Sequence, residues 1–403
     1  MVHFTVANHA WASYHTSVNS PSDLFDHHAD YQPDDSLEGL LKSTPAKWVV
    51  YLFTDAADNP VQLLCVKNLR ASLKRRLGGE EIMGPTRKVD YRDLVRRVYW
   101  RRVDSAFEAD LAYLEIARDI FPKSYRGMLG FDPAWFVHVN PADDFPRYVK
   151  TIDPTRPGQA IGPFADKHAA ARFFQLVEDA FDLCRYYNIL IEAPDGRACA
   201  YKEMGKCPAP CDGSISMEQY RELIKWSAAT VVSPEGFVAE HTARMNAAAS
   251  ELNFEAAARI KQFVEQIGQF GHGAFRFAKR LEDFQFLSLQ HGPRRGTAKI
   301  FLVMQGMIEQ VGCVIDELRV PSDFLRHILS RAARTRTEMT EQAVERMGIV
   351  TDHLFRARRS SGVFLPICDL EERSFSKAYK ELQKQNTPDD SEEEGVIKEL
   401  QQL

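Results

Sequence analysis

The sequence of 403 residues contains no apolar run that approaches the roughly 20 residues of a membrane-spanning helix. Its first residues, Met1 to Asn19, lack the basic-then-apolar order of a secretory signal. Basic residues do not predominate, because 51 Lys and Arg stand against 56 Asp and Glu, a net charge of −5. This balance excludes a chain that coats nucleic acid by bulk charge, but it allows a local basic face. We expect a cytoplasmic protein without membrane contact.

The short C-x2-C spacing of common zinc sites is also absent. The seven cysteines are an odd number in a chain without an export signal, so they do not indicate a disulfide framework. Four of them, Cys184, Cys199, Cys207 and Cys211, lie within 28 residues, spaced C-x14-C-x7-C-x3-C. Thiolates this close repel one another unless a cation neutralises them, so the cluster predicts zinc or an iron–sulfur centre. Four ordinary buried thiols are the alternative.

Composition and periodicity predict a multidomain α+β fold. Two apolar strands flank a turn within 48–66, a helix capped by Ser105 and Glu108 covers 105–120, and "WFVHV" at 135–139 is a further strand. Residues 381–403 hold seven acids and two bases, which is typical of a solvated tail. The predicted segments are a flexible leader (1–42), a small mixed α/β domain (43–150), a four-cysteine segment (160–232), a helical hairpin (235–270), a β-rich and helical C-terminal region (280–380) and an acidic disordered tail (381–403).

Two amphipathic helices are predicted between residues 237 and 268. Apolar residues recur there at steps of three or four from Met245 to Ile267, and Asn253 suits the turn between the helices. A lone hairpin of this size cannot bury its apolar stripe by itself. It therefore belongs either to the core or to a surface that binds another protein.

A local basic stretch lies between Lys67 and Arg102, where twelve Lys or Arg stand against four Asp or Glu. Tyr91, Tyr99 and Trp100 are interleaved with these charges, a combination that suits phosphate contact and base stacking. The alternative is an ordinary solvated face. The residues predicted to bind DNA are Lys67, Arg70, Lys74, Arg75, Arg96, Arg97, Arg101 and Arg102.

Three of these segments resemble parts of UvrC, the nuclease subunit of bacterial nucleotide-excision repair. The segment "YKEMGKCPAPCDGSISMEQYRELI" is similar to the family's cysteine-rich segment, and "AASELNFEAAARI" is similar to its UVR motif, which engages the UvrB subunit. "VVYLFTDAADNPVQLLCVKNLR" follows the signature of the family's GIY-YIG nuclease domain without a gap. The resemblance implies DNA as a partner, a [4Fe–4S] cluster rather than zinc, and a UvrB-like partner protein. The residues implied at the partner surface are Met245, Leu252, Phe254 and Ile260.

The resemblance also implies a degenerate nuclease centre. Tyr51 matches the tyrosine of the first GIY-YIG signature, but Gln62 stands at the second tyrosine and Ser72 at the catalytic arginine. Arg76 stands at a further tyrosine, and Tyr113 at the metal-binding glutamate. If the correspondence is right, Tyr51, Ser72 and Tyr113 should share one pocket.

Nearby residues offer few replacements for these groups. Asp110 shares a helix face with position 113, whereas Glu115 faces away. Lys74 or Arg75 could replace the missing catalytic arginine, but each side chain leaves the helix in a different direction from that of Ser72. Mg²⁺ or Mn²⁺ is expected only if the centre is active.

The family's RNase H-like nuclease domain has no expected counterpart in the 85 residues after 318. The leading hypothesis is therefore a UvrC-like repair protein that binds DNA and a partner without cutting. The alternatives are a divergent structure-specific endonuclease with a rearranged metal site, and a metal-cluster scaffold with no role on nucleic acid.

Overall fold

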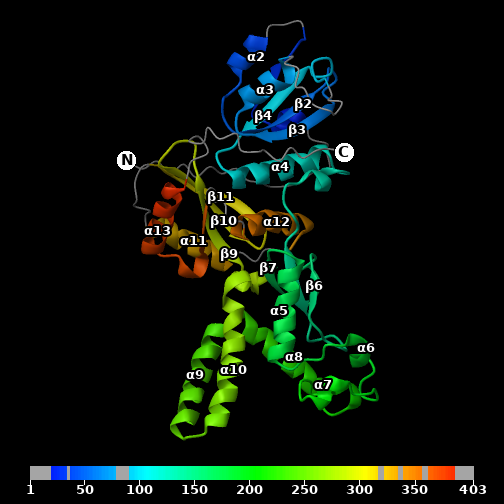
Figure 1. Cartoon of the computed structure of the whole chain (residues 1–403). Helices are drawn as coiled ribbons and strands as arrows, with labels where there is room; N and C mark the ends of the chain where they lie inside the picture. Colours follow the sequence, from blue (N-terminus) through cyan, green and yellow to red (C-terminus); the bar gives the residue numbers. More distant parts are fainter. Residues whose placement is uncertain are drawn as a thin grey trace.

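Three four-stranded antiparallel sheets, each with helices against it, make up the described part of the protein (Figure 1). The structure is a computed structural model, which describes residues 20–33, 37–78, 90–315, 322–334, 339–355 and 362–385. The arrangement confirms the predicted α+β multidomain class. Among the described residues no helix is both long and apolar enough to cross a membrane.

The N-terminal sheet has the strand order β1-β4-β2-β3. Its strands are β1 (His27–Asp30), β2 (Val49–Thr54), β3 (Pro60–Val66) and β4 (Arg97–Arg102). Because side chains alternate along a strand, Tyr51 and Phe53 of β2 face α3 (Leu69–Leu77), while Val50 and Leu52 face α4 (Ala106–Ile120). Strands β2 and β3 and helix α4 lie where the sequence predicts them.

Residues 20–33 and 37–42 belong to this unit, so the expectation of a loosely attached leader is wrong for them. They form α1 (Pro21–Leu24), strand β1 and most of α2 (Leu37–Ser43). Strand β1 pairs antiparallel with β4, and the ring of His28 lies 5.5 Å from that of Tyr99. The sequence His-His-Ala-Asp of β1 has no alternation of apolar and polar residues, so it carries little strand signal by itself. Residues 1–19 lie outside the described residues.

The second sheet has the order β6-β5-β7-β8. Its strands are β5 (Trp135–Val139), β6 (Val149–Thr151), β7 (Gln159–Phe164) and β8 (Lys279–Arg280). Val137 of β5 pairs with Ile161 of β7, so the predicted domain end at 150 is wrong: β5 starts the middle unit. The helices of this unit are α5 (Lys167–Ala180), α6 (Tyr187–Leu190), α7 (Ala200–Glu203) and α8 (Met217–Val232).

The predicted helical hairpin is present as α9 (Pro234–Ser250) and α10 (Phe254–Gly268). The Asn253 side chain accepts a hydrogen bond from the amide of Ala256 at 3.2 Å and so caps α10. Leu252 before it has a φ of 59°, which turns the chain sharply. The hairpin extends away from all three sheets (Figure 1).

The third sheet has the order β11-β10-β9-β12. Its strands are β9 (Gln285–His291), β10 (Thr297–Met304), β11 (Met307–Ile315) and β12 (Val363–Pro366). Strands β10 and β11 form a hairpin, because Gln305 and Gly306 turn the chain at φ of 49° and 84°. Helices α11 (Ser322–Arg334) and α13 (Glu372–Lys384) pack on one face, and α12 (Glu341–Phe355) lies between the other face and α4.

The predicted acidic tail overlaps this unit at its beginning. Residues 381–384 are the last turn of α13, and Leu382 is fully buried, so a disordered tail is wrong for them. Residues 386–403 lie outside the described residues. Short 3-10 helices at Tyr125–Met128, Pro210–Asp212, Gln269–Gly271, Gly273–Phe275, Leu281–Asp283 and Ile367–Asp369 complete the described elements.

Candidate functional site

Four of the five residues predicted at GIY-YIG catalytic positions meet on the α3 face of the N-terminal sheet. The Tyr51 hydroxyl lies 3.0 Å from the Ser72 hydroxyl, and the two side chains are 0% and 3% exposed. Burial raises the pKa of Tyr51 to about 12, against the smaller opposing effects of Arg76 and Ser72. Tyr51 is therefore a protonated core residue, sealed under α3.

Gln62 and Arg76 lie on the same face. The Arg76 guanidinium donates to the side-chain oxygen of Gln62 at 3.1 Å and stacks over the ring of Tyr91, 5.5 Å from its centroid. Four of the five predicted positions thus converge in space, as the ungapped correspondence requires. What converges is a phenol, a hydroxyl, an amide and one guanidinium.

Tyr113 does not join this group, and the predicted common pocket is wrong for it. It lies on α4 and packs with Val50 and Leu52, on the opposite face of the sheet from Tyr51. Its hydroxyl donates to the Leu63 carbonyl at 3.5 Å, and burial raises its pKa. A carboxylate at position 113 would therefore also lie behind the sheet.

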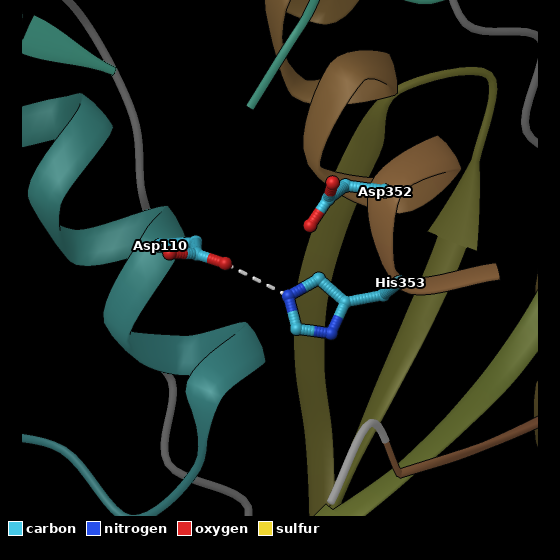
Figure 2. A group of neighbouring side chains, drawn as sticks. All are labelled: Asp110, Asp352 and His353. Carbon is cyan, nitrogen blue, oxygen red and sulfur yellow. Dashed lines mark hydrogen bonds and ion pairs between the residues drawn. The ribbon is translucent and has the colours of Figure 1, made fainter. Parts of the chain in front are cut away.

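Asp110 cannot replace the missing carboxylate for the same reason. It lies on α4, and its Oδ2 accepts a hydrogen bond from His353 Nε2 of α12 at 2.9 Å (Figure 2). Lys74 and Arg75, the possible substitutes for the arginine, are exposed on the outer side of α3.

Helix α4 contacts the C-terminal unit through buried ion pairs that the sequence did not predict. Lys299 of β10 lies 2.7 Å from Asp104 and 2.6 Å from Glu108. Burial opposes the charge of Lys299, but the two carboxylates outweigh it and raise its pKa. Arg346 of α12 pairs with Glu115 at 2.8 Å. The one signal in the sequence was a single lysine inside the apolar strand "TAKIFLVM".

The four cysteines of the middle unit are free of disulfides and lie at one end of it. Cys184, Cys207 and Cys211 are buried, and Cys199 is half-buried. A hydrogen bond from Cys184 lowers the pKa of Cys207 to about 6 and raises that of Cys184. The described residues bring one group of three ligand atoms within 4.8 Å of one another, and it contains no cysteine. Among the described residues no three of the four sulfur atoms lie within 4.8 Å of one another, although the thiols of Cys184 and Cys207 are close enough to share a hydrogen bond.

The basic residues predicted to bind DNA differ in exposure and in their internal contacts. Arg97 pairs with Asp30 and Asp58, each at 2.6 Å, and the Arg70 guanidinium donates to the Thr44 carbonyl at 2.8 Å. The side chains of Arg96 and Arg101 are half-buried. The exposed side chains are Lys67, Arg70, Lys74, Arg75 and Arg102.

Two of the three aromatic residues of the basic stretch are not available for stacking on bases. Tyr99 is 4% exposed and Trp100 is 5% exposed, because both belong to the core of the sheet. The stacking interpretation is therefore wrong for these two residues.

The hairpin exposes large apolar side chains at its tip. Leu252 is 74% exposed and Phe254 is 65% exposed. Met245 and Ile260 are half-buried between the helices. The first two residues predicted for a partner surface are thus accessible, and the other two support the hairpin.

Comparison with known proteins locates the relationship in the middle of the chain. Residues 134–229, which begin at β5 and end in α8, match the family model of the UvrC/Cho excinuclease middle domain. This chain is UvrC-like. The UvrABC system protein C of Caldanaerobacter subterraneus is 25% identical over 283 residues, which cover 68% of this chain and 44% of that protein. The UvrABC system protein C of Clostridium botulinum strain Hall is 25% identical over 277 residues, with the same coverage.

The UvrC-like chain therefore spans less than half the length of these curated relatives. No solved structure matches it. The likeness covers the cysteine segment in full, since Cys184, Cys199, Cys207 and Cys211 all fall inside residues 134–229.

Proposed function

We propose that this UvrC-like chain acts in nucleotide-excision repair by binding DNA and a repair partner, with an inactive GIY-YIG-like centre. The observation that carries the proposal is the complete burial of Tyr51, whose hydroxyl is held by Ser72 at the position of the catalytic arginine.

A nuclease centre must bring a phosphate, a water and a cation into contact with its side chains. Tyr51 has no exposed surface and, with a pKa of about 12, keeps its proton near neutral pH. The Arg76 guanidinium, which lies on the same face as Tyr51, is engaged by Gln62 and Tyr91. The divergent-endonuclease alternative needs a carboxylate on this face, and Asp110 and position 113 lie on the other one.

The four cysteines are proposed to hold a [4Fe–4S] cluster. Three are buried, and the lowered pKa of Cys207 favours a thiolate, the form in which cysteine ligates iron. Zinc, which takes the same thiolate ligands, is the alternative. Bound there, the group would cross-link the segments around Cys184 and Cys207.

DNA is proposed to meet the exposed basic residues, chiefly Lys67, Lys74 and Arg102, through phosphate contacts that carry no sequence preference. The UvrB-like partner is proposed to meet the hairpin tip. Two large apolar side chains on a projecting hairpin, Leu252 and Phe254, provide a small anchor for a partner helix.

The experiment is fluorescence anisotropy with a duplex carrying a bulky adduct, with and without a UvrB protein, between 50 and 200 mM salt. We expect binding that weakens steeply with salt and a ternary complex that Leu252→Ala weakens. DNA affinity that salt does not change would favour the scaffold without a role on nucleic acid. Binding followed by metal-dependent nicking would favour the endonuclease.

A further inference from the structure

A second group of potential metal ligands lies between α4 and α12, apart from the four cysteines. It consists of Asp110 of α4 and the consecutive residues Asp352 and His353 of α12 (Figure 2). One ligand atom of each residue lies within 4.8 Å of those of the other two. In Figure 2 the two carboxylates and the imidazole point toward one another across the space between the helices.

His353 is held rigidly in this group. Its side chain is 1% exposed, and the ring of Phe107 packs edge-on against the imidazole, 5.3 Å between centroids. Nε2 donates to Asp110 at 2.9 Å. One carboxylate oxygen of Asp352 lies within 4.8 Å of the ligand atoms of both residues, although consecutive residues of a helix project about 100° apart. Two carboxylates and one imidazole at one point are a common ligand set for a divalent cation.

An ion can reach this group of side chains from the solvent. The Asp110 side chain is 34% exposed, so water and ions reach the group from outside. Nδ1 of His353 has no hydrogen-bond partner among the described residues. With an ion at Nε2, the imidazole proton has to be on Nδ1, the other ring nitrogen. Ligand atoms around one ion lie about 3 Å apart, so the half-buried aspartates must turn inward by about 1 Å.

We propose that Asp110, Asp352 and His353 bind one divalent cation of the oxygen- and nitrogen-preferring class, such as Mn²⁺, with the open positions filled by water. Because its ligands come from both sides of the contact, the ion ties the N-terminal sheet unit to the C-terminal unit. The site does not depend on the α3 face or on the cysteines. A failure here therefore leaves the proposed repair function standing.

The test is titration of the full chain with Mn²⁺, followed by loss of the electron paramagnetic resonance signal of the free ion. Thiolates prefer softer metals, so the cysteine segment does not compete for this probe. We expect one bound ion per chain, and binding at least about tenfold weaker in Asp352→Asn and His353→Gln. Asp352→Asn leaves the His353–Asp110 bond in place and so preserves the fold. The matched control is His138→Gln, which changes a buried histidine bonded to the Pro157 carbonyl instead.

A thermal readout tests the link between the units. Mn²⁺ should raise the unfolding temperature of the wild type and of His138→Gln, but not that of Asp352→Asn. The proposal is overturned if the wild type binds no Mn²⁺, or if Asp352→Asn binds and responds as the wild type does.

Discussion

Replacement of Lys299 should weaken the contact between the N-terminal and C-terminal units more than loss of any surface charge. The Lys299 side chain is 15% exposed, and its partners Asp104 and Glu108 are 16% and 19% exposed. Breaking a buried ion pair costs about 3–5 kcal/mol, because the remaining charges stay buried without compensation. Since all three groups keep some access to water, we expect Lys299→Met to lower the free energy of unfolding by about 2–3 kcal/mol at pH 7.

The pH dependence of this contact follows from Lys299 itself. In the wild type the pKa of Lys299 is raised above its usual 10.5, so its stabilising charge is present at every pH below that value and is lost only as the pH rises past it.

Urea denaturation followed by circular dichroism measures the change. The matched control is Lys225→Met, which breaks a pair with Glu222 whose side chains are 54% and 60% exposed. We expect the control to cost less than about 0.5 kcal/mol. Adding Glu108→Gln to Lys299→Met should restore part of the loss. Equal midpoints for Lys299→Met and Lys225→Met would refute the view that this ion cluster joins the units.

Three further predictions concern the surfaces and the cysteine segment. Phe254→Ala should weaken binding of a UvrB-like partner about tenfold without changing the unfolding midpoint, because the Phe254 side chain is exposed. The control is Leu329→Ala on α11, whose side chain is 39% exposed. Equal effects of the two substitutions on partner binding would contradict the hairpin tip as the binding surface. Cys207→Ser should remove iron and sulfide from anaerobically purified protein. Cys313→Ser, which changes an exposed cysteine outside the four-cysteine segment, should not. Retention of iron and sulfide in Cys207→Ser would rule out a ligand role for Cys207. Arg102→Met should reduce by about one the slope of log binding constant against log salt concentration for DNA binding. Arg97→Met should lower the free energy of unfolding and leave that slope unchanged, because Arg97 pairs with Asp30 and Asp58. The reverse pattern would contradict the assignment of Arg97 to internal pairs.

Local patterns predicted the elements of this fold well. The turn between β2 and β3, the helix that begins after Ser105 and the turn at Asn253 each depend on neighbours in the sequence. The errors arose where a strand finds its partner far along the chain. Strand β1 is defined by pairing with β4, and β5 is assigned to the middle sheet by pairing with β7.

The candidate site shows the same division. The ungapped correspondence with the GIY-YIG signature correctly predicted that four residues share one face of the sheet, because their spacing is set within two strands and one helix. These residues are Tyr51, Gln62, Ser72 and Arg76. The correspondence failed at Tyr113, since the side of the sheet that α4 covers is a tertiary property. The pairs of Lys299 and His353 with α4 join residues more than 190 positions apart, which no local pattern reveals.

The most direct test of the account is cleavage of a lesion-containing duplex by the purified chain with a UvrB protein and Mg²⁺ or Mn²⁺. We predict no nicking by the wild type, and the same result for Tyr51→Phe and Arg76→Met. Metal-dependent nicking by the wild type that either substitution abolishes would show that the α3 face is a working nuclease centre.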